Sequence, residues 1–185
     1  MMIWRRVAGA LCLMAGLSAG AATSLAQATT PGQPDMETQT FGSWTMRCVA
    51  KGTAGPVCDI VQGVTNRETG KQIMQVSFAY IAEKDKYAVQ VVLPLGFLIP
   101  PGVLVRIDGA PDITDWPVTR CEPQGCLIEH LMDAEVLKPF RTKDKGTVIV
   151  LGAQGKPLGF PMSFNGFSAA SDAMTARNKA AGKGK

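Results

Sequence analysis

Residues 74–93 read MQVSFAYIAEKDKYAVQVVL, and this stretch decides the fold class. Large apolar side chains alternate with small or polar ones over residues 74–80 and again over residues 87–93. A period of two is that of a β-strand with one buried face. The charged segment 83–86 between the two runs has the length of a hairpin connection. The stretch therefore predicts two neighbouring antiparallel strands that pack one face against a core.

Comparable short runs lie on both sides of this hairpin. They fall near residues 44–48, 58–64, 103–107, 116–121, 147–151 and 160–164. Turn residues separate the runs, and strands do not alternate with long helices, which argues against a parallel sheet. Eight or nine short strands with this spacing are typical of a sandwich. We predict an all-β fold, namely an antiparallel immunoglobulin-like β-sandwich with one or two short helices and two disulfides.

Two short helices are expected in the C-terminal third of the chain. We expect Asp133 to cap a helix that Pro139 ends, and Ser168 to cap a second helix that reaches Met174. No apolar stripe continues beyond Met174. Residues 176–185, rich in Lys and Ala, are therefore predicted to form a basic disordered tail.

The first 28 residues have the organisation of a secretion signal. Arg5 and Arg6 precede an apolar stretch that is shorter than the roughly 20 residues of a membrane span. Small residues then predict a mature N-terminus at Gln27 or Thr29, and an uncleaved anchor is the alternative. We expect a periplasmic protein, with secretion or association with the outer membrane as further options, and no transmembrane segment in the mature chain.

The remaining chain is predicted to fold as one domain, residues 41–175, preceded by a flexible lead at residues 29–40. The formal net charge of +4 comes from the two ends of the chain, because the signal and the tail carry the excess of basic residues. The domain itself is close to neutral. This argues against a nucleic acid partner, which would need a basic face.

Four cysteines remain after the signal is removed, and they form two local pairs, Cys48/Cys58 and Cys121/Cys126. Each pair encloses turn-forming residues, so a disulfide within each pair would staple a hairpin. Four cysteines allow three connectivities, and the turn chemistry favours the local one. Zinc binding or a redox-active dithiol would favour a two-residue spacing, and both remain as alternatives.

No catalytic constellation stands out in the sequence. His130 is the one histidine, and no nucleophile elbow accompanies it. Carboxylates and methionines are scattered, so we expect neither a metal nor a cofactor.

One apolar segment cannot form a regular element. Residues 93–102, LPLGFLIPPG, carry prolines and glycines among large apolar side chains. Its candidate partner-binding residues are Leu95, Phe97, Leu98 and Ile99, because an apolar surface loop favours a protein partner. The alternative is that the segment plugs one end of the sandwich. We expect Leu98 to be buried in this way and Phe97 to be exposed.

Five motifs in order resemble the invasion-associated locus B family. They are F-x-x-W-x-x-x-C at residues 41–48, Cys58 with Ile60 and Gln62, the segment LPLG at 93–96 with Gly102, Val103, Ile107 and Asp108, the pair Cys121 with Gly125-Cys126, and Gly166-Phe167 with Ala170. The resemblance covers residues 41–175 and implies a secreted or periplasmic β-sandwich protein of alphaproteobacterial type. It also implies that the four cysteines are disulfide partners. The founding members of the family are associated with entry into host cells.

The resemblance carries no established catalytic residues. We therefore expect a non-enzymatic envelope or secreted protein that binds a protein of the envelope or of a host cell, with peripheral membrane association left open. One alternative is a periplasmic accessory or chaperone-like module whose apolar loop engages outer-membrane cargo. Another is a redox or hydrolytic enzyme built on Cys121/Cys126 or on His130.

Overall fold

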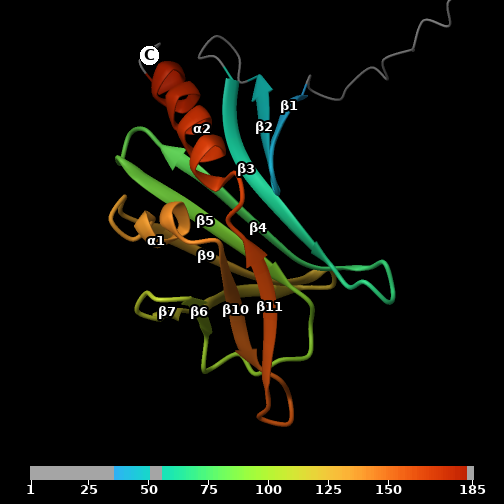
Figure 1. The fold of residues 1–185 in the computed structure, drawn as a ribbon. Helices are drawn as coiled ribbons and strands as arrows, with labels where there is room; N and C mark the ends of the chain where they lie inside the picture. Colours follow the sequence, from blue (N-terminus) through green and yellow to red (C-terminus); the bar gives the residue numbers. More distant parts are fainter. Residues whose placement is uncertain (1–35, 51–55, 183–185) are drawn as a thin grey trace, which may run out of the picture. The chain divides into compact units, whose positions relative to one another are not determined.

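The computed structural model describes residues 36–50 and 56–182 (Figure 1). The predicted signal peptide and residues 29–35 of the predicted lead lie outside these ranges. The strands are β1 (Met36–Phe41), β2 (Trp44–Ala50), β3 (Pro56–Thr65), β4 (Gln72–Ile81), β5 (Lys86–Leu93), β6 (Val103–Ile107), β7 (Ile113–Trp116), β8 (Val118–Glu122), β9 (Gly125–Met132), β10 (Lys145–Leu151) and β11 (Pro157–Ser163). The helices are α1 (Lys138–Thr142) and α2 (Phe167–Gly182).

The strands form two antiparallel sheets. The larger sheet has the order β1-β2-β3-β4-β5-β9-β8, and the smaller sheet has the order β11-β10-β6-β7. The prediction of an all-β sandwich with one or two helices and two disulfides is confirmed, although α2, with 16 residues, is longer than the short helix expected. In the larger sheet, β1 to β5 follow one another in sequence order as a simple meander, and β9 and β8 complete the sheet beside β5.

The predicted central hairpin is β4–β5. Its register pairs Phe78 with Val89 and Tyr80 with Tyr87, and all four side chains are buried on the inner face. The connection between the strands bends through Asp85, whose φ of 50° is in the left-handed region. The period of two in residues 74–93 thus corresponds to one buried face of the larger sheet.

Aromatic side chains fill the centre of the core. Phe167 of α2 lies 5.0 Å from Trp44 of β2 and 5.1 Å from Phe78 of β4, as measured between ring centroids. Phe140 of α1 lies 5.5 Å from the Phe78 ring. These edge-to-face contacts add about 0.5–1.5 kcal/mol each to the burial of the rings. Both helices therefore cover the same inner face of the larger sheet.

A side chain of α2 forms hydrogen bonds with backbone groups of β3 and β4 where these two strands no longer pair with each other. The ladder between these strands ends at the pair Ile60 and Phe78, so the next positions, Cys58 and Tyr80, are not paired with each other. Asn178 of α2 accepts a hydrogen bond from the Cys58 amide at 2.8 Å. It also donates to the carbonyl oxygens of Cys58 at 2.9 Å and Tyr80 at 3.0 Å. One side chain thus satisfies backbone groups of two diverging strands.

The prediction of a disordered tail at residues 176–185 is wrong for the described part of that segment. Helix α2 continues to Gly182, and Asn178 is buried. The physical reason is that this turn of the helix is held by polar contacts to strand backbones. Such contacts need no apolar stripe, so the hydrophobic pattern of the sequence does not reveal this part of the helix.

The predicted flexible lead also contains a strand. β1 pairs along its whole length with β2, from Met36 opposite Val49 to Phe41 opposite Trp44. Its side chains are exposed up to residue 40, so the sequence shows no alternation. Backbone hydrogen bonds to β2, and not burial, define this edge strand.

The first predicted helix lies further along the chain than expected. Residues 133–137 form turns, and α1 begins at Lys138 with Pro139 in its first turn. Proline is tolerated there because the first amides of a helix have no intrahelical acceptor. Pro139 therefore starts this helix and does not end it. Ser168 was expected to cap the second helix, but it lies inside α2, which begins at Phe167. Its Oγ donates a hydrogen bond to the Arg141 carbonyl oxygen at 3.0 Å.

Candidate functional site

The apolar segment after β5 is fixed to the smaller sheet through its backbone. The Leu98 amide donates to the Leu151 carbonyl at 2.7 Å, and Phe97 forms a β-bridge with Gly152. Gly96 has a φ of 104°, a conformation that other residues rarely adopt. The loop is thus anchored at its middle, and its conformation depends on Gly96.

Three large side chains of this loop face solvent. Leu95 is 56% exposed, Leu98 is 39% exposed and Ile99 is 50% exposed. Phe97 is half-buried and packs against the core. The sequence predicts a buried Leu98 and an exposed Phe97, and the structure shows the opposite. The bridge to Gly152 places the Phe97 side chain toward the core and leaves the Leu98 side chain in solvent.

Strand β11 adds a fourth apolar side chain to this surface. Leu158 is 44% exposed and packs over Gly152, the residue that Phe97 bridges. We call the four exposed residues Leu95, Leu98, Ile99 and Leu158 the apolar tip. The β10–β11 turn beside them lies at the end of the described domain away from α2 (Figure 1).

The sequence analysis missed Leu158, although a signal for it exists. The tetrapeptide PLGF occurs twice, at residues 94–97 and at residues 157–160. In both copies the leucine is exposed and the phenylalanine faces the core, with Phe160 8% exposed. The two copies thus present the same side chains to solvent from two segments that are far apart in the chain.

The cysteines form two disulfides, Cys48–Cys58 between β2 and β3 and Cys121–Cys126 between β8 and β9. Cys48, Cys58 and Cys126 are buried, whereas Cys121 lies exposed on the edge strand β8. Among the described residues no group of three or more His, Cys, Asp or Glu side chains could hold a metal ion.

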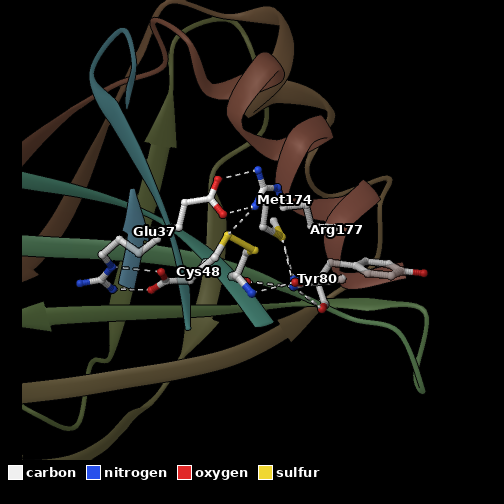
Figure 2. Close-up of a disulfide and its surroundings, with 9 residues drawn as sticks. Glu37, Cys48, Tyr80, Met174 and Arg177 are labelled. Atoms are coloured by element: carbon white, nitrogen blue, oxygen red, sulfur yellow. Dashed lines mark hydrogen bonds and ion pairs between the residues drawn. A yellow bond between two sulfur atoms is a disulfide. The ribbon is translucent and has the colours of Figure 1, made fainter. Parts of the chain in front are cut away.

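Figure 2 shows how α2 closes over the first disulfide. Arg177 donates to both carboxylate oxygens of Glu37 in β1, at 2.6 and 2.7 Å, and lies 3.9 Å from the Cys48 sulfur. The Met174 sulfur accepts a hydrogen bond from the Tyr80 amide at 3.1 Å. The hydrogen bonds from Arg177 lower the pKa of Glu37 from its ordinary value. The disulfide, β1 and α2 thus form one connected structural unit.

His130 does not belong to a catalytic group in the described structure. Its ring stacks on Trp116 with centroids 5.6 Å apart and an interplanar angle of 26°. This contact explains a histidine on the inner side of β9 by packing alone.

The outer face of the larger sheet carries a shallow groove of about 320 Å³. Small side chains of β4 and β5, including Ser77, Ala79 and Ala88, form its floor. Its carboxylates are already engaged: Arg47 donates to Asp59 at 3.0 Å, and Gln90 donates to Glu129 at 3.0 Å. Neither Asp59 nor Glu129 is therefore left without a partner in this groove.

The sequence profile of the family described as "Invasion associated locus B (IalB) protein" matches residues 44–175. The chain belongs to this family. Invasion protein B of Bartonella bacilliformis is 23% identical to it over 162 residues, which cover 86% of each protein. One structural neighbour is described as the crystal structure of invasion associated protein b from Bartonella henselae, with a TM-score of 0.67 and 22% identity. The alignment covers 76% of this chain and 96% of that one, and it shows a shared fold.

The predicted resemblance to the invasion-associated locus B family is thus confirmed. The match includes the apolar loop, both disulfides and the first half of α2, because all of them lie within residues 44–175. No helix in the described ranges has the length and apolar character that crossing a membrane requires.

Proposed function

We propose that this IalB-family protein works outside the cytoplasm as a non-enzymatic binding protein, and that it engages a protein of the bacterial envelope or of a host cell through the apolar tip. The observation that carries the proposal is the exposure of Leu95, Leu98, Ile99 and Leu158 on two segments that meet at Gly152. Contiguous apolar side chains on the surface of a soluble domain mark interaction sites.

The backbone of the apolar tip supports this proposal. The Leu98 amide is hydrogen-bonded to β10, and the chain on either side of it carries Pro94, Pro100 and Pro101. A loop that is already ordered loses little conformational entropy when a partner binds. The side chains can therefore contribute most of their burial energy to the complex.

The proposed location outside the cytoplasm rests on the secretion signal that the sequence predicts and on the two disulfides. Disulfides persist in oxidising compartments such as the periplasm. The relatives from two Bartonella species are named as invasion proteins, which supports a role at the cell envelope or beyond it.

The proposed binding surface can be tested with paired serine substitutions. In the variant Leu95→Ser/Leu98→Ser both side chains are already exposed, so the melting temperature should change little. Recovery of a partner from intact envelopes or host-cell membranes should nevertheless be lost, and a photo-reactive residue at position 98 of the otherwise unchanged protein should crosslink to that partner. The matched control is Leu131→Ser/Val136→Ser, since these residues are 43% and 37% exposed and lie outside the apolar tip.

The proposal is wrong if the first variant recovers the same partner as the unchanged protein. Preferential binding of unfolded outer-membrane proteins would instead indicate the chaperone-like alternative.

A further inference from the structure

A second cleft, of about 520 Å³, lies where the end of β3 meets β10 and β11. Arg67 and Lys145 line it together with Ser43 and Ser163, and no carboxylate is found among the described residues of its lining. The apolar part of its wall comes from Val64, Pro161 and Met162. The cleft is separate from the apolar tip, because the two share no residue.

Arg67 differs from the other arginines of the described residues. The others are each held by a carboxylate, in the pairs Arg47–Asp59, Arg106–Asp112, Arg120–Glu122, Arg141–Asp172 and Arg177–Glu37. No such pair includes Arg67 within the ranges that the structure describes. A guanidinium without a carboxylate partner, at a concave surface, is available to bind an anion in its fork geometry.

Lys145 can add a second positive charge. Its Nζ lies 3.7 Å from Asp108, and both side chains are largely exposed, so this pair contributes little. Lys145 lies opposite Ser163 in the register of β10 and β11. Lys145 is therefore the direct cross-strand neighbour of Ser163, one of the two serines that line the cleft.

The floor of the cleft is held in place by Gln62. This side chain is 6% exposed, donates to the carbonyl oxygens of Ser43 and Ser163 at 3.2 and 2.9 Å, and accepts from the Ser163 amide at 2.9 Å. The hydroxyls of Ser43 and Ser163 lie 3.2 Å apart, and the Asn165 amide donates to the Ser163 Oγ. The Ser43 hydroxyl donates its proton to the Ser163 Oγ. The proton of the Ser163 hydroxyl is therefore left to donate to a ligand.

The turn that carries Arg67 is ordered as well. The Asn66 Oδ1 accepts hydrogen bonds from the amides of Glu68 and Thr69 at 2.9 and 3.0 Å. The Asn66 amide donates to the Lys71 carbonyl at 2.9 Å. Arg67 is thus presented from a fixed backbone, which reduces the entropy lost when it binds an anion.

We propose that this cleft binds a phosphate group. Arg67 supplies a bidentate contact, Lys145 a second positive charge, and the serine pair a hydroxyl donor. Together they match the several oxygens of a phosphate better than the two oxygens of a carboxylate. The apolar wall leaves room for the organic part that carries the phosphate, either a small soluble molecule or a phospholipid.

The test compares the full mature protein with its variant Arg67→Ala at low salt. Titration calorimetry with inorganic phosphate measures binding of the free group, and co-sedimentation with vesicles of phosphatidylglycerol or of phosphatidylcholine measures binding of a lipid head group. We expect phosphate, phosphatidylglycerol vesicles, or both to bind, and Arg67→Ala to weaken that binding by about tenfold or more. The matched control is Arg106→Ala, which also removes an exposed arginine but one that is paired with Asp112.

The outcomes separate the two sources of phosphate. If Arg67→Ala loses binding of inorganic phosphate, the result supports a soluble ligand. If Arg67→Ala loses binding of phosphatidylglycerol vesicles and the Arg106→Ala control does not, the result supports a lipid. The proposal is overturned if neither probe binds, or if Arg67→Ala and Arg106→Ala weaken binding equally. It is also overturned if inorganic phosphate does not bind and vesicle binding is unchanged in Arg67→Ala, a result that would assign membrane contact to another surface such as the apolar tip.

Discussion

Asn178 shows how much one polar residue can contribute to this fold. Its amide group makes three hydrogen bonds to the backbones of β3 and β4 at the point where these strands separate. A buried backbone group without a partner destabilises a protein by about 1–3 kcal/mol. The side chain therefore stabilises two strands and the last turns of α2 at the same time.

We predict that Asn178→Leu lowers the free energy of unfolding by about 3 kcal/mol, because it leaves Cys58 and Tyr80 backbone groups buried and unpaired. Urea denaturation monitored by circular dichroism measures the change. The control Ala176→Ser lies on the exposed side of the same helix and should change stability by less than about 0.5 kcal/mol. Equal stability of Asn178→Leu and the unchanged protein would contradict the structural role given to this residue.

Elements distant in the sequence are joined by α2. The helix packs mainly on β3 and β4, and Arg177 connects it to β1 at the edge of the larger sheet. The pair that Arg177 forms with Glu37 is largely exposed, so its contribution should depend on pH and salt.

The pH dependence of this contact can be predicted with its sign. Hydrogen bonding to Arg177 lowers the pKa of Glu37 in the folded protein, so the contact stabilises the fold above the unfolded pKa of Glu37. The stabilisation is lost as the pH falls through the folded pKa. A double-mutant cycle with Glu37→Gln and Arg177→Ala should therefore give a favourable coupling energy at pH 7 and none in strong acid. A coupling energy that persists when Glu37 is protonated would show that the charge is not responsible.

At the scale of the whole molecule, the two disulfides restrict the unfolded chain in different degrees. Cys48 and Cys58 are ten residues apart, whereas Cys121 and Cys126 are five apart. The longer loop loses more entropy when it is closed. The first disulfide is also buried beneath α2, and the second lies at a sheet edge with Cys121 exposed.

We predict that the double variant Cys48→Ala/Cys58→Ala loses about 2–5 kcal/mol of stability, and that Cys121→Ala/Cys126→Ala loses less. Guanidinium denaturation of both variants measures the difference. Titration of free thiols in the native protein should find none, and peptide mapping without reduction should find only the two local pairs. A titratable Cys121/Cys126 dithiol in the exported protein would support the redox alternative.

The strands of the larger sheet can be predicted from the sequence because every second side chain of its central strands is buried on one face. The alternation of residues 74–93 identified the central hairpin, and it did so because each strand buries every second side chain. The turn residues between the cysteines favoured the local pairs. The apolar loop was recognised because prolines and glycines exclude a regular element there.

The parts that only the tertiary structure decided depend on partners far away in the chain. β1 is a strand because β2 offers it backbone hydrogen bonds, and the end of α2 is a helix because Asn178 meets Cys58 and Tyr80. Leu158 joins the apolar tip only because Gly152 brings the two PLGF segments together. Local patterns report which face of an element is buried, whereas backbone pairing and surface clusters depend on contacts between segments that the sequence keeps apart.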